Sequence, residues 1–218
     1  MALARIHGLK TQYQDDVLSV DTLAACDNSM LRWRQLCPFH VWSSAAVLVP
    51  GRPDLRSRSV EAVWQGLKLV DGQLALDQLG STPHKRPPDE GRGAGYCYED
   101  SAFMLDERRL DLLTARYLIY LPTYLHMLDT LVDVDLLACI DDWLTSGRGV
   151  AFYDWDSNMD IDDPRGSFSH SALLARWFNG TLGPALERAH DLASSLGLPS
   201  PARPARYFER PVEEESLW

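Results

Sequence analysis

Residues 59–72 read Ser59-Val60-Glu61-Ala62-Val63-Trp64-Gln65-Gly66-Leu67-Lys68-Leu69-Val70-Asp71-Gly72. A serine, which can cap a helix, opens this stretch, and an Asp-Gly pair, which can stop a helix, closes it. The stretch therefore predicts one short helix. At about 100° per residue, its aliphatic side chains fall on a single arc that should face a hydrophobic core: Val60, Val63, Leu67 and Val70.

The polar side chains of the same stretch gather on a second arc. On the helical wheel Glu61 and Lys68 lie within roughly 20° of each other. Gln65 lies beside them and Trp64 at the border, a combination typical of a pocket wall. With Ser59 as the N-cap, the helix dipole should keep the pKa of Glu61 low and its carboxylate ionised at neutral pH. The alternative is a solvated face on which Lys68 is an ordinary surface residue.

The composition limits the classes of protein that the chain can belong to. With 218 residues, of which 45% are hydrophobic, it can bury the core of one domain. A net charge of −10 argues against nucleic acid as a partner, because such proteins need a basic surface. The sequence shows no membrane-spanning run and no signal peptide, and its four widely spaced cysteines are typical of reduced thiols. We therefore expect a cytoplasmic protein that does not bind a membrane.

Hydrophobic periodicity along the rest of the chain favours helices. Strand-like segments are expected only near residues 45–51 and 149–153, and the Gly/Pro-rich residues 80–100 should form a long loop. The expected helices cover residues 106–132, 133–147, 169–179 and 184–196. The predicted fold class is mainly α with a few short β-strands, in a single domain spanning residues 1–218. Within it, residues 1–30 are an N-terminal extension and residues 200–218 a Pro-rich, acidic tail.

An acidic segment follows the strand predicted at residues 149–153. Asp154 lies where this strand would leave the core, which is a common position for a catalytic carboxylate. A calcium loop is excluded because position 159 is Met159 and no glycine follows at the required place. His170, in the first turn of the next helix, should be neutral and able to donate or accept a hydrogen bond. Alternatively, Asp154 caps that helix and His170 is structural.

Basic residues flank the first predicted helix, and they are candidates for holding a phosphate. The alternative is that these are loop charges that bind nothing: Arg52, Arg56, Arg58, His84, Lys85, Arg86 and Arg92. The sequence contains no zinc motif, no phosphate-binding P-loop, no dinucleotide fingerprint and no nucleophile elbow. We therefore expect neither a metal nor a cofactor.

The pattern Ser-x-Glu-x-x-x-Gln-x-x-Lys resembles the signature helix of the NADAR/YbiA-like N-glycosidases, which reads Ser/Thr-x-Glu-His-x-x-Gln-x-x-Lys. Members of that group cleave N-glycosidic bonds of ribosylated or ADP-ribosylated substrates, and the helix glutamate is regarded as catalytic. The resemblance matches Glu61, Gln65 and Lys68 to the three polar positions. Ala62 stands where the family has histidine, which puts the role of that histidine in doubt here.

Further segments resemble an actinobacterial family of the same apparent type, over residues 37–180. They are Cys37–His40, Thr82–Arg86, Ala115–Pro122, Tyr153–Asn158 and Ser169–Leu174. The resemblance implies a single-domain YbiA-like fold. It also implies that Asp154, Trp155 and Asn158 lie near the active site.

Together these observations predict an N-glycosidase for a small ribosylated or nucleotide-like substrate, with a place in a specialised biosynthetic pathway as one form of this function. Glu61 would stabilise the oxocarbenium-like transition state and Asp154 would protonate the leaving base. Lys68, Lys85 and Arg86 would hold phosphate or ribose hydroxyls, and Trp64 or Trp155 would stack on the base. The remaining substrate-binding candidates are Gln65, Asn158 and His170. The alternatives are an ADP-ribosyl hydrolase, or a nucleotide- or ADP-ribose-binding protein without catalysis, which the loss of histidine at Ala62 would suit.

Overall fold

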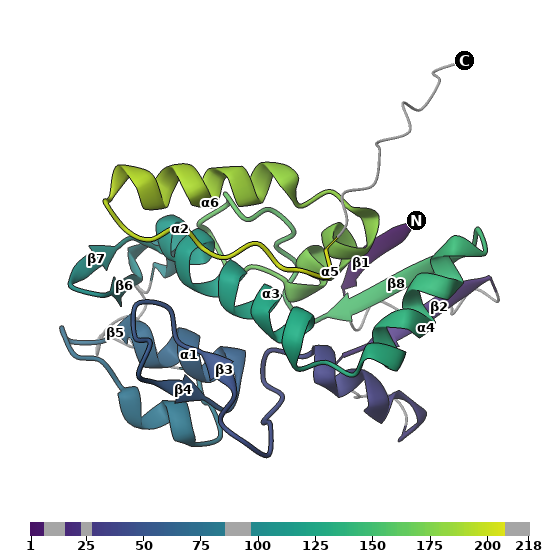
Figure 1. The fold of residues 1–218 in the computed structure, drawn as a ribbon, viewed down its shortest axis with the longest axis horizontal. Coiled ribbons are helices and arrows are strands. Elements are labelled where there is room, and N and C mark those ends of the chain that lie inside the picture. The colour runs from purple at the N-terminus through teal and green to yellow at the C-terminus, as the bar shows by residue number, and fades with distance from the viewer. Residues whose placement is uncertain (7–15, 23–27, 86–96, 208–218) are drawn as a thin grey trace.

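The computed structural model describes residues 1–6, 16–22, 28–85 and 97–207 (Figure 1). Helices make up 43% and strands 17% of the structure, with the strands in a few small sheets. The chain is therefore a mix of α and β, and the prediction of a mainly α fold is wrong. The prediction failed because several strands are only two to five residues long and lie in segments expected to be helical or peripheral.

The first sheet is built around β8 (Gly149–Asp154), which lies between β1 (Ala2–Ile6) and β2 (Val17–Asp21). Both neighbours run parallel to β8. Residues 1–30, expected to be an extension, thus supply both edge strands. A parallel sheet is normally buried on both faces, and β8 is buried from Val150 to Asp154. The strand predicted at residues 149–153 is confirmed.

Two antiparallel sheets accompany the first helix. In one, β3 (Val47–Leu48) pairs with β4 (Arg56–Ser57). In the other, β6 (Ala102–Leu105) lies between β5 (Lys68–Leu69) and β7 (Arg108–Leu110). The helix expected from residue 106 is wrong at its start, because residues 102–110 form a hairpin. Helix α2 (Leu112–Ala115) begins only after Asp111, whose carboxylate accepts a 2.7 Å hydrogen bond from the Thr114 N–H.

Helix α1 (Val60–Leu67) begins as predicted, because the Ser59 hydroxyl accepts a 3.1 Å hydrogen bond from the Ala62 N–H. It ends earlier than predicted. Lys68 belongs to β5 and pairs with Phe103 of β6, and a turn at residues 71–72 follows. All eight residues of α1 are buried, so its polar side chains face the interior and the solvated-face alternative is wrong.

A continuous helical run follows α2. It passes through the π-helical segment η4 (Arg116–Tyr120) into α3 (Leu121–Thr130). Pro122 falls in the first turn of α3, where its missing N–H is tolerated. The remaining helices are α4 (Val134–Thr145), α5 (His170–Asn179), α6 (Gly183–Ser195) and the 3-10 segments η1 (Asn28–Leu36), η2 (Leu76–Gly80) and η3 (Tyr98–Asp100).

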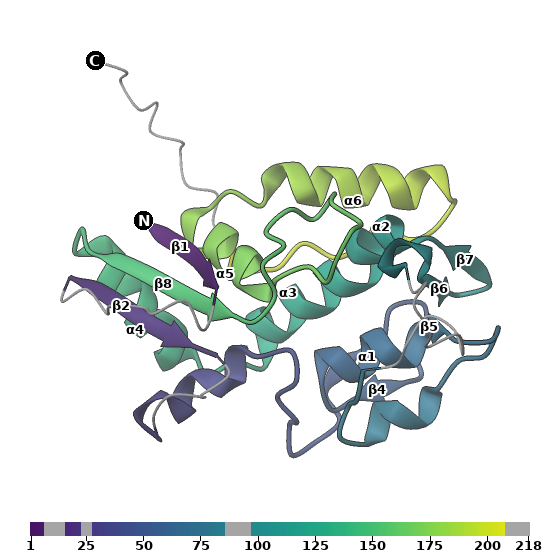
Figure 2. The same cartoon turned by 180° about the vertical axis from the view of Figure 1, so that it is seen from behind.

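Helix α3 occupies the middle of the molecule. Figures 1 and 2 show it between α6 and the group formed by α1, β3 and β4. Its buried side chains join these layers into one hydrophobic core. Residues 200–207 of the expected tail pack here, because the Asp129 carboxylate accepts hydrogen bonds from the Ala205 and Arg206 N–H groups at 3.1 and 2.6 Å. Residues 208–218 lie outside the described part. Within that part, no helix has the length and apolar character needed to cross a membrane.

Candidate functional site

Glu61 presents a carboxyl group inside the protein, from the first turn of α1. Its side chain accepts a 2.7 Å hydrogen bond from Gln65, one helical turn later, and its N–H donates to the Pro38 carbonyl at 2.9 Å. Burial raises the pKa of Glu61, against the opposing effects of the Gln65 bond and of Lys85 and Lys68. The sequence-based expectation of a low pKa is therefore wrong in direction, because the cost of removing the charge from water outweighs the helix dipole.

Asp154, at the end of β8, is buried as well but lies in the opposite environment. One of its oxygens, Oδ2, accepts hydrogen bonds from the Ser169 hydroxyl at 2.7 Å and the His170 N–H at 3.0 Å. The His170 Nδ1 lies 2.7 Å from the same oxygen. Burial by itself would raise the pKa of Asp154, but His170 and these hydrogen bonds hold it well below its usual range.

The hydrogen bonding continues from His170 to Thr22. The other imidazole nitrogen, Nε2, lies 2.6 Å from the Thr22 hydroxyl oxygen, which is also 3.3 Å from the Tyr153 carbonyl. Thr22 and His170 are both buried. Sequence reasoning missed Thr22, because its position beside His170 depends on the pairing of β2 with β8 and no local motif signals it.

Two tyrosines, Tyr120 and Tyr124, lie near the carboxyl groups of Glu61 and Asp154. Both carboxylates raise the pKa of Tyr120, which burial already places well above its ordinary value. The Tyr120 ring stacks on Tyr124 with centroids 6.0 Å apart, and Tyr124 lies 6.2 Å from the His170 ring. We call these residues, with Gln65, the Glu61–Asp154 cluster. It brings together side chains from α1, η4, α3, β8 and α5.

Cys37 adjoins the Glu61–Asp154 cluster. Burial, assisted by the carboxylates of Asp154 and Glu61, raises the pKa of its thiol to about 11. The thiol is therefore kept protonated, which disfavours a nucleophilic role.

The structure places two of the three expected cations near Glu61. Lys68 and Lys85 both lower the pKa of its carboxyl group. Lys68 is buried, with its ammonium 5.8 Å from the centre of the Tyr98 ring. The Lys85 side chain is largely exposed, and its Nζ lies 4.0 Å from Asp156 Oδ2. Arg86 and Arg92 lie outside the described residues.

The arginines that precede α1 have other contacts. Arg58 donates to the Trp42 carbonyl at 3.0 Å, and Arg56 donates to the Pro53 and Leu55 carbonyls. These bonds hold the turns before α1.

The two candidate tryptophans differ in exposure. Trp64 is buried against Phe103 and Tyr120, with ring centroids 4.0 and 5.5 Å away, so core aromatics occupy its surroundings. Trp155 directly follows Asp154 and is 60% exposed. Of the two, Trp155 has the ring surface on which a planar base could stack.

Asn158 holds the loop between β8 and α5. Its amide donates to the Asp163 and Gly166 carbonyls at 2.8 and 3.3 Å, and its oxygen accepts from the Asp160 N–H at 3.0 Å. Among the described residues, no group of three or more His, Cys, Asp or Glu is arranged to hold a metal.

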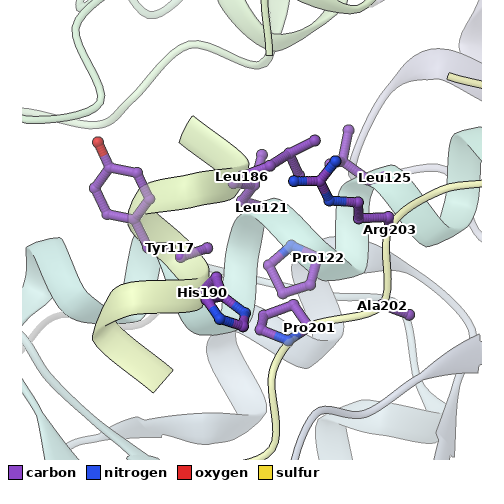
Figure 3. A pocket seen from close by; sticks show the side chains of 10 residues that line it. Tyr117, Leu121, Pro122, Leu125, Leu186, His190, Pro201, Ala202 and Arg203 are labelled. Carbon is purple, nitrogen blue, oxygen red and sulfur yellow. The ribbon is translucent and has the colours of Figure 1, made fainter. Parts of the chain in front are cut away.

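Two cavities lined by described residues lie along η4 and α3. Figure 3 shows a pocket of about 80 Å³ between α6, α3 and residues 201–203, lined by Tyr117, Pro122 and His190 among others. This volume is too small for a nucleotide. A hollow of about 600 Å³ adjoins it, between β3, α3 and residues 198–204. Neither is lined by a member of the Glu61–Asp154 cluster.

Comparison with known proteins gives a family without an assigned activity. Searches of curated proteins and of solved structures returned no match. The model of a family of unknown function, DUF6939, matches residues 4–174, a range that contains the whole Glu61–Asp154 cluster and Thr22. The chain therefore belongs to the DUF6939 family.

Proposed function

We propose that this protein is an N-glycosidase that hydrolyses the C–N glycosidic bond of a small ribosylated or nucleotide-like substrate. The observation that carries the proposal is the pair of buried carboxyl groups, Glu61 and Asp154, which share neighbours but have different hydrogen-bond partners. Paired carboxyl groups in contrasting environments are the usual apparatus of glycosidic cleavage. The resemblance of α1 to the NADAR/YbiA-like signature helix agrees with this proposal and stays a prediction.

The structure favours an exchange of the two roles expected from the sequence. Because burial favours its protonated form, Glu61 would donate a proton to the leaving base as the C–N bond breaks. Asp154, held ionised, would stabilise the positive charge that develops at the sugar C1. Water would then add to C1 and return a proton to the Glu61 carboxylate. The step consumes one water and releases the free base and the sugar.

The face of Asp154 that meets the sugar would be its Oδ1 side. Oδ2 accepts the bonds from Ser169 and His170. Within the described part of the chain, Oδ1 accepts one long hydrogen bond, of 3.3 Å, from the Asp156 N–H. Lys85 is exposed beside Asp156 and would contact the phosphate or hydroxyl groups of the substrate. Trp155 would stack on the base of the substrate.

The test is incubation of the purified protein with a panel of compounds, followed by mass spectrometry. The panel contains purine, pyrimidine and pterin-precursor ribonucleotides, NAD and ADP-ribosyl compounds. Wild-type protein should release a free base, and Glu61→Gln should lower the rate by about 100-fold or more. Glu187→Gln, on the exposed face of α6, is the matched control and should have wild-type activity.

Thermal stabilisation by the same panel separates the proposal from its main alternative. A compound that stabilises wild-type and Glu61→Gln proteins alike, and is never cleaved over hours, would identify a binding protein without catalysis. Cleavage at the same rate by wild type and Glu61→Gln would reject the role of Glu61.

A further inference from the structure

Three segments distant in sequence meet around His170. Strand β2 runs beside β8 with Asp21 opposite Tyr153, so Thr22 lies next to the end of β8 that carries Asp154. The N-terminus of α5 supplies Ser169, which caps the helix, and His170. His170 is thereby placed between Asp154 on one side and Thr22 on the other.

The distances indicate which atoms carry the protons in the hydrogen bonds that link Thr22, His170 and Asp154. A carboxylate only accepts hydrogen bonds, so the 2.7 Å contact of Asp154 with Nδ1 requires a proton on Nδ1. In the neutral imidazole Nε2 is then an acceptor, and the Thr22 hydroxyl, 2.6 Å away, is its donor. The Tyr153 carbonyl, at 3.3 Å, is the more distant acceptor for that hydroxyl. With a neutral ring, donation therefore runs from the Thr22 hydroxyl to Nε2 and from Nδ1 to Asp154, whereas a protonated ring would donate from Nε2 to Thr22 and leave the Thr22 hydroxyl to donate to the Tyr153 carbonyl.

We propose that Thr22 is a positioning residue that fixes the tautomer and orientation of His170 and, through His170, the carboxylate of Asp154. Thr22 has no exposed surface, so it acts through His170 and does not touch the substrate. With Oδ2 held by His170 and Ser169, Asp154 is left to present Oδ1. The catalytic part of this inference rests on the proposed function, whereas the tautomer of His170 does not.

The chain offers close controls for the removal of this hydroxyl. Ser19 lies in β2, three residues before Thr22, and Ser171 lies next to His170. Both hydroxyls are buried, and in the described part of the chain neither oxygen has a hydrogen-bond partner. Ser19→Ala and Ser171→Ala therefore each remove a nearby buried hydroxyl but keep the hydrogen bonds that link Thr22, His170 and Asp154.

The first measurement is the tautomer of His170, by nitrogen-15 NMR of histidine-labelled protein with His170→Gln used to assign the signal. In wild-type protein we expect a proton on Nδ1 that exchanges slowly with water. Thr22→Val should speed this exchange about tenfold, because Nε2 loses its donor and the ring loses its orientation. Thr22→Ser should restore the slow exchange, and both control variants should retain it.

The second measurement uses a substrate found in the panel. Thr22→Val should lower kcat by about tenfold with little change in KM, since partners that orient a first-contact residue typically contribute 10- to 100-fold. Thr22→Ser should recover the rate. Unchanged kcat and unchanged exchange in a folded Thr22→Val protein would overturn the inference.

The wild-type spectrum gives an answer even if Thr22→Val does not fold. A neutral His170 whose proton is on Nε2 would overturn the inference by itself. Failure of the panel to yield any product would reject the proposed function, and the NMR result would still decide the role of Thr22.

Discussion

Arg116 and Asn158 donate hydrogen bonds to the same two carbonyl oxygens, those of Asp163 and Gly166. The Arg116 guanidinium reaches them at 2.7 and 2.5 Å and the Asn158 amide at 2.8 and 3.3 Å. Arg116 also donates to the Ile161 carbonyl at 2.8 Å. The buried guanidinium of Arg116 thus holds the loop that joins β8 to α5 through hydrogen bonds to three of its carbonyl groups. Since this loop begins after Asp154 and ends before Ser169, its shape sets the distance between them.

Replacing Arg116 should therefore destabilise the protein strongly. In Arg116→Met the volume is largely kept, but three loop carbonyls lose a charged donor, and we expect a loss of about 3 kcal/mol in the free energy of unfolding. Urea denaturation measures it. Arg165→Met is the matched control on the same loop, because Arg165 is exposed and, within the described part of the chain, pairs with Asp163 alone. Equal losses in the two variants would contradict the role given to Arg116.

Asp154→Asn should destabilise the protein at neutral pH by about 3 kcal/mol, because it replaces a buried carboxylate oxygen that accepts hydrogen bonds from Ser169 and His170. The folded state holds the pKa of Asp154 below its ordinary value of 3.8, so its carboxylate stabilises the fold above pH 3.8. This contribution is lost as the pH falls through the folded-state pKa. The stability difference between wild type and Asp154→Asn should thus be full at pH 7 and shrink below pH 3.8. Asp142→Asn, on the exposed side of α4, is the matched control for the substitution itself.

Glu61→Gln should show the opposite dependence on pH. Burial raises the pKa of Glu61 above its ordinary value of 4.5, so the wild-type fold loses stability as the pH rises from 4.5 through the raised pKa. The neutral amide of Gln does not share this loss. The melting temperature of Glu61→Gln relative to wild type should therefore be higher at pH 8 than at pH 4. A difference that is the same at both values would show that burial does not control the ionisation of Glu61.

Two glycines with positive φ should respond differently to alanine. Gly72 has φ of +73° and open space around its α-carbon, so Gly72→Ala should lose about 1 kcal/mol through backbone strain alone. Gly51 has φ of +69°, and an added Cβ would lie 2.8 Å from the Asp106 backbone nitrogen. Gly51→Ala should therefore lose clearly more, because the turn between β6 and β7 must shift. Chemical denaturation of the two variants side by side checks the order, and a larger loss in Gly72→Ala would reverse it.

Local signals in the sequence were sufficient for helix ends. Ser59, Asp133 and Ser169 each accept a hydrogen bond from a backbone N–H in the first turn of the helix that follows, and Gly180 ends α5 in the left-handed conformation. These features depend on a few neighbouring residues, so one sequence contains the information. The strand that leads to Asp154 was also predictable, from its continuous apolar run.

Features that depend on long-range pairing were not predictable. Lys68 was expected on the face of α1, but its pairing with Phe103 draws it into β5. The strands of residues 1–30 gave no sign of pairing with β8. The pKa directions of Glu61 and Asp154 likewise follow from burial and from partners brought by α5, which overrule the helix dipole at Glu61. The side chains of the Glu61–Asp154 cluster therefore come together only in the tertiary structure.

The position of β8 between β1 and β2 bears on how the chain folds as it is synthesised. β1 and β2 leave the ribosome before β8, the strand that pairs with both of them. The strand edges of β1 and β2 that pair with β8 therefore stay unpaired until β8 has been made. Closing such distant parallel pairs costs loop entropy before any contact forms, so this sheet should be a slow step in folding. Thr22 and Asp154 can meet only after that step, which makes the site one of the last parts of the molecule to form.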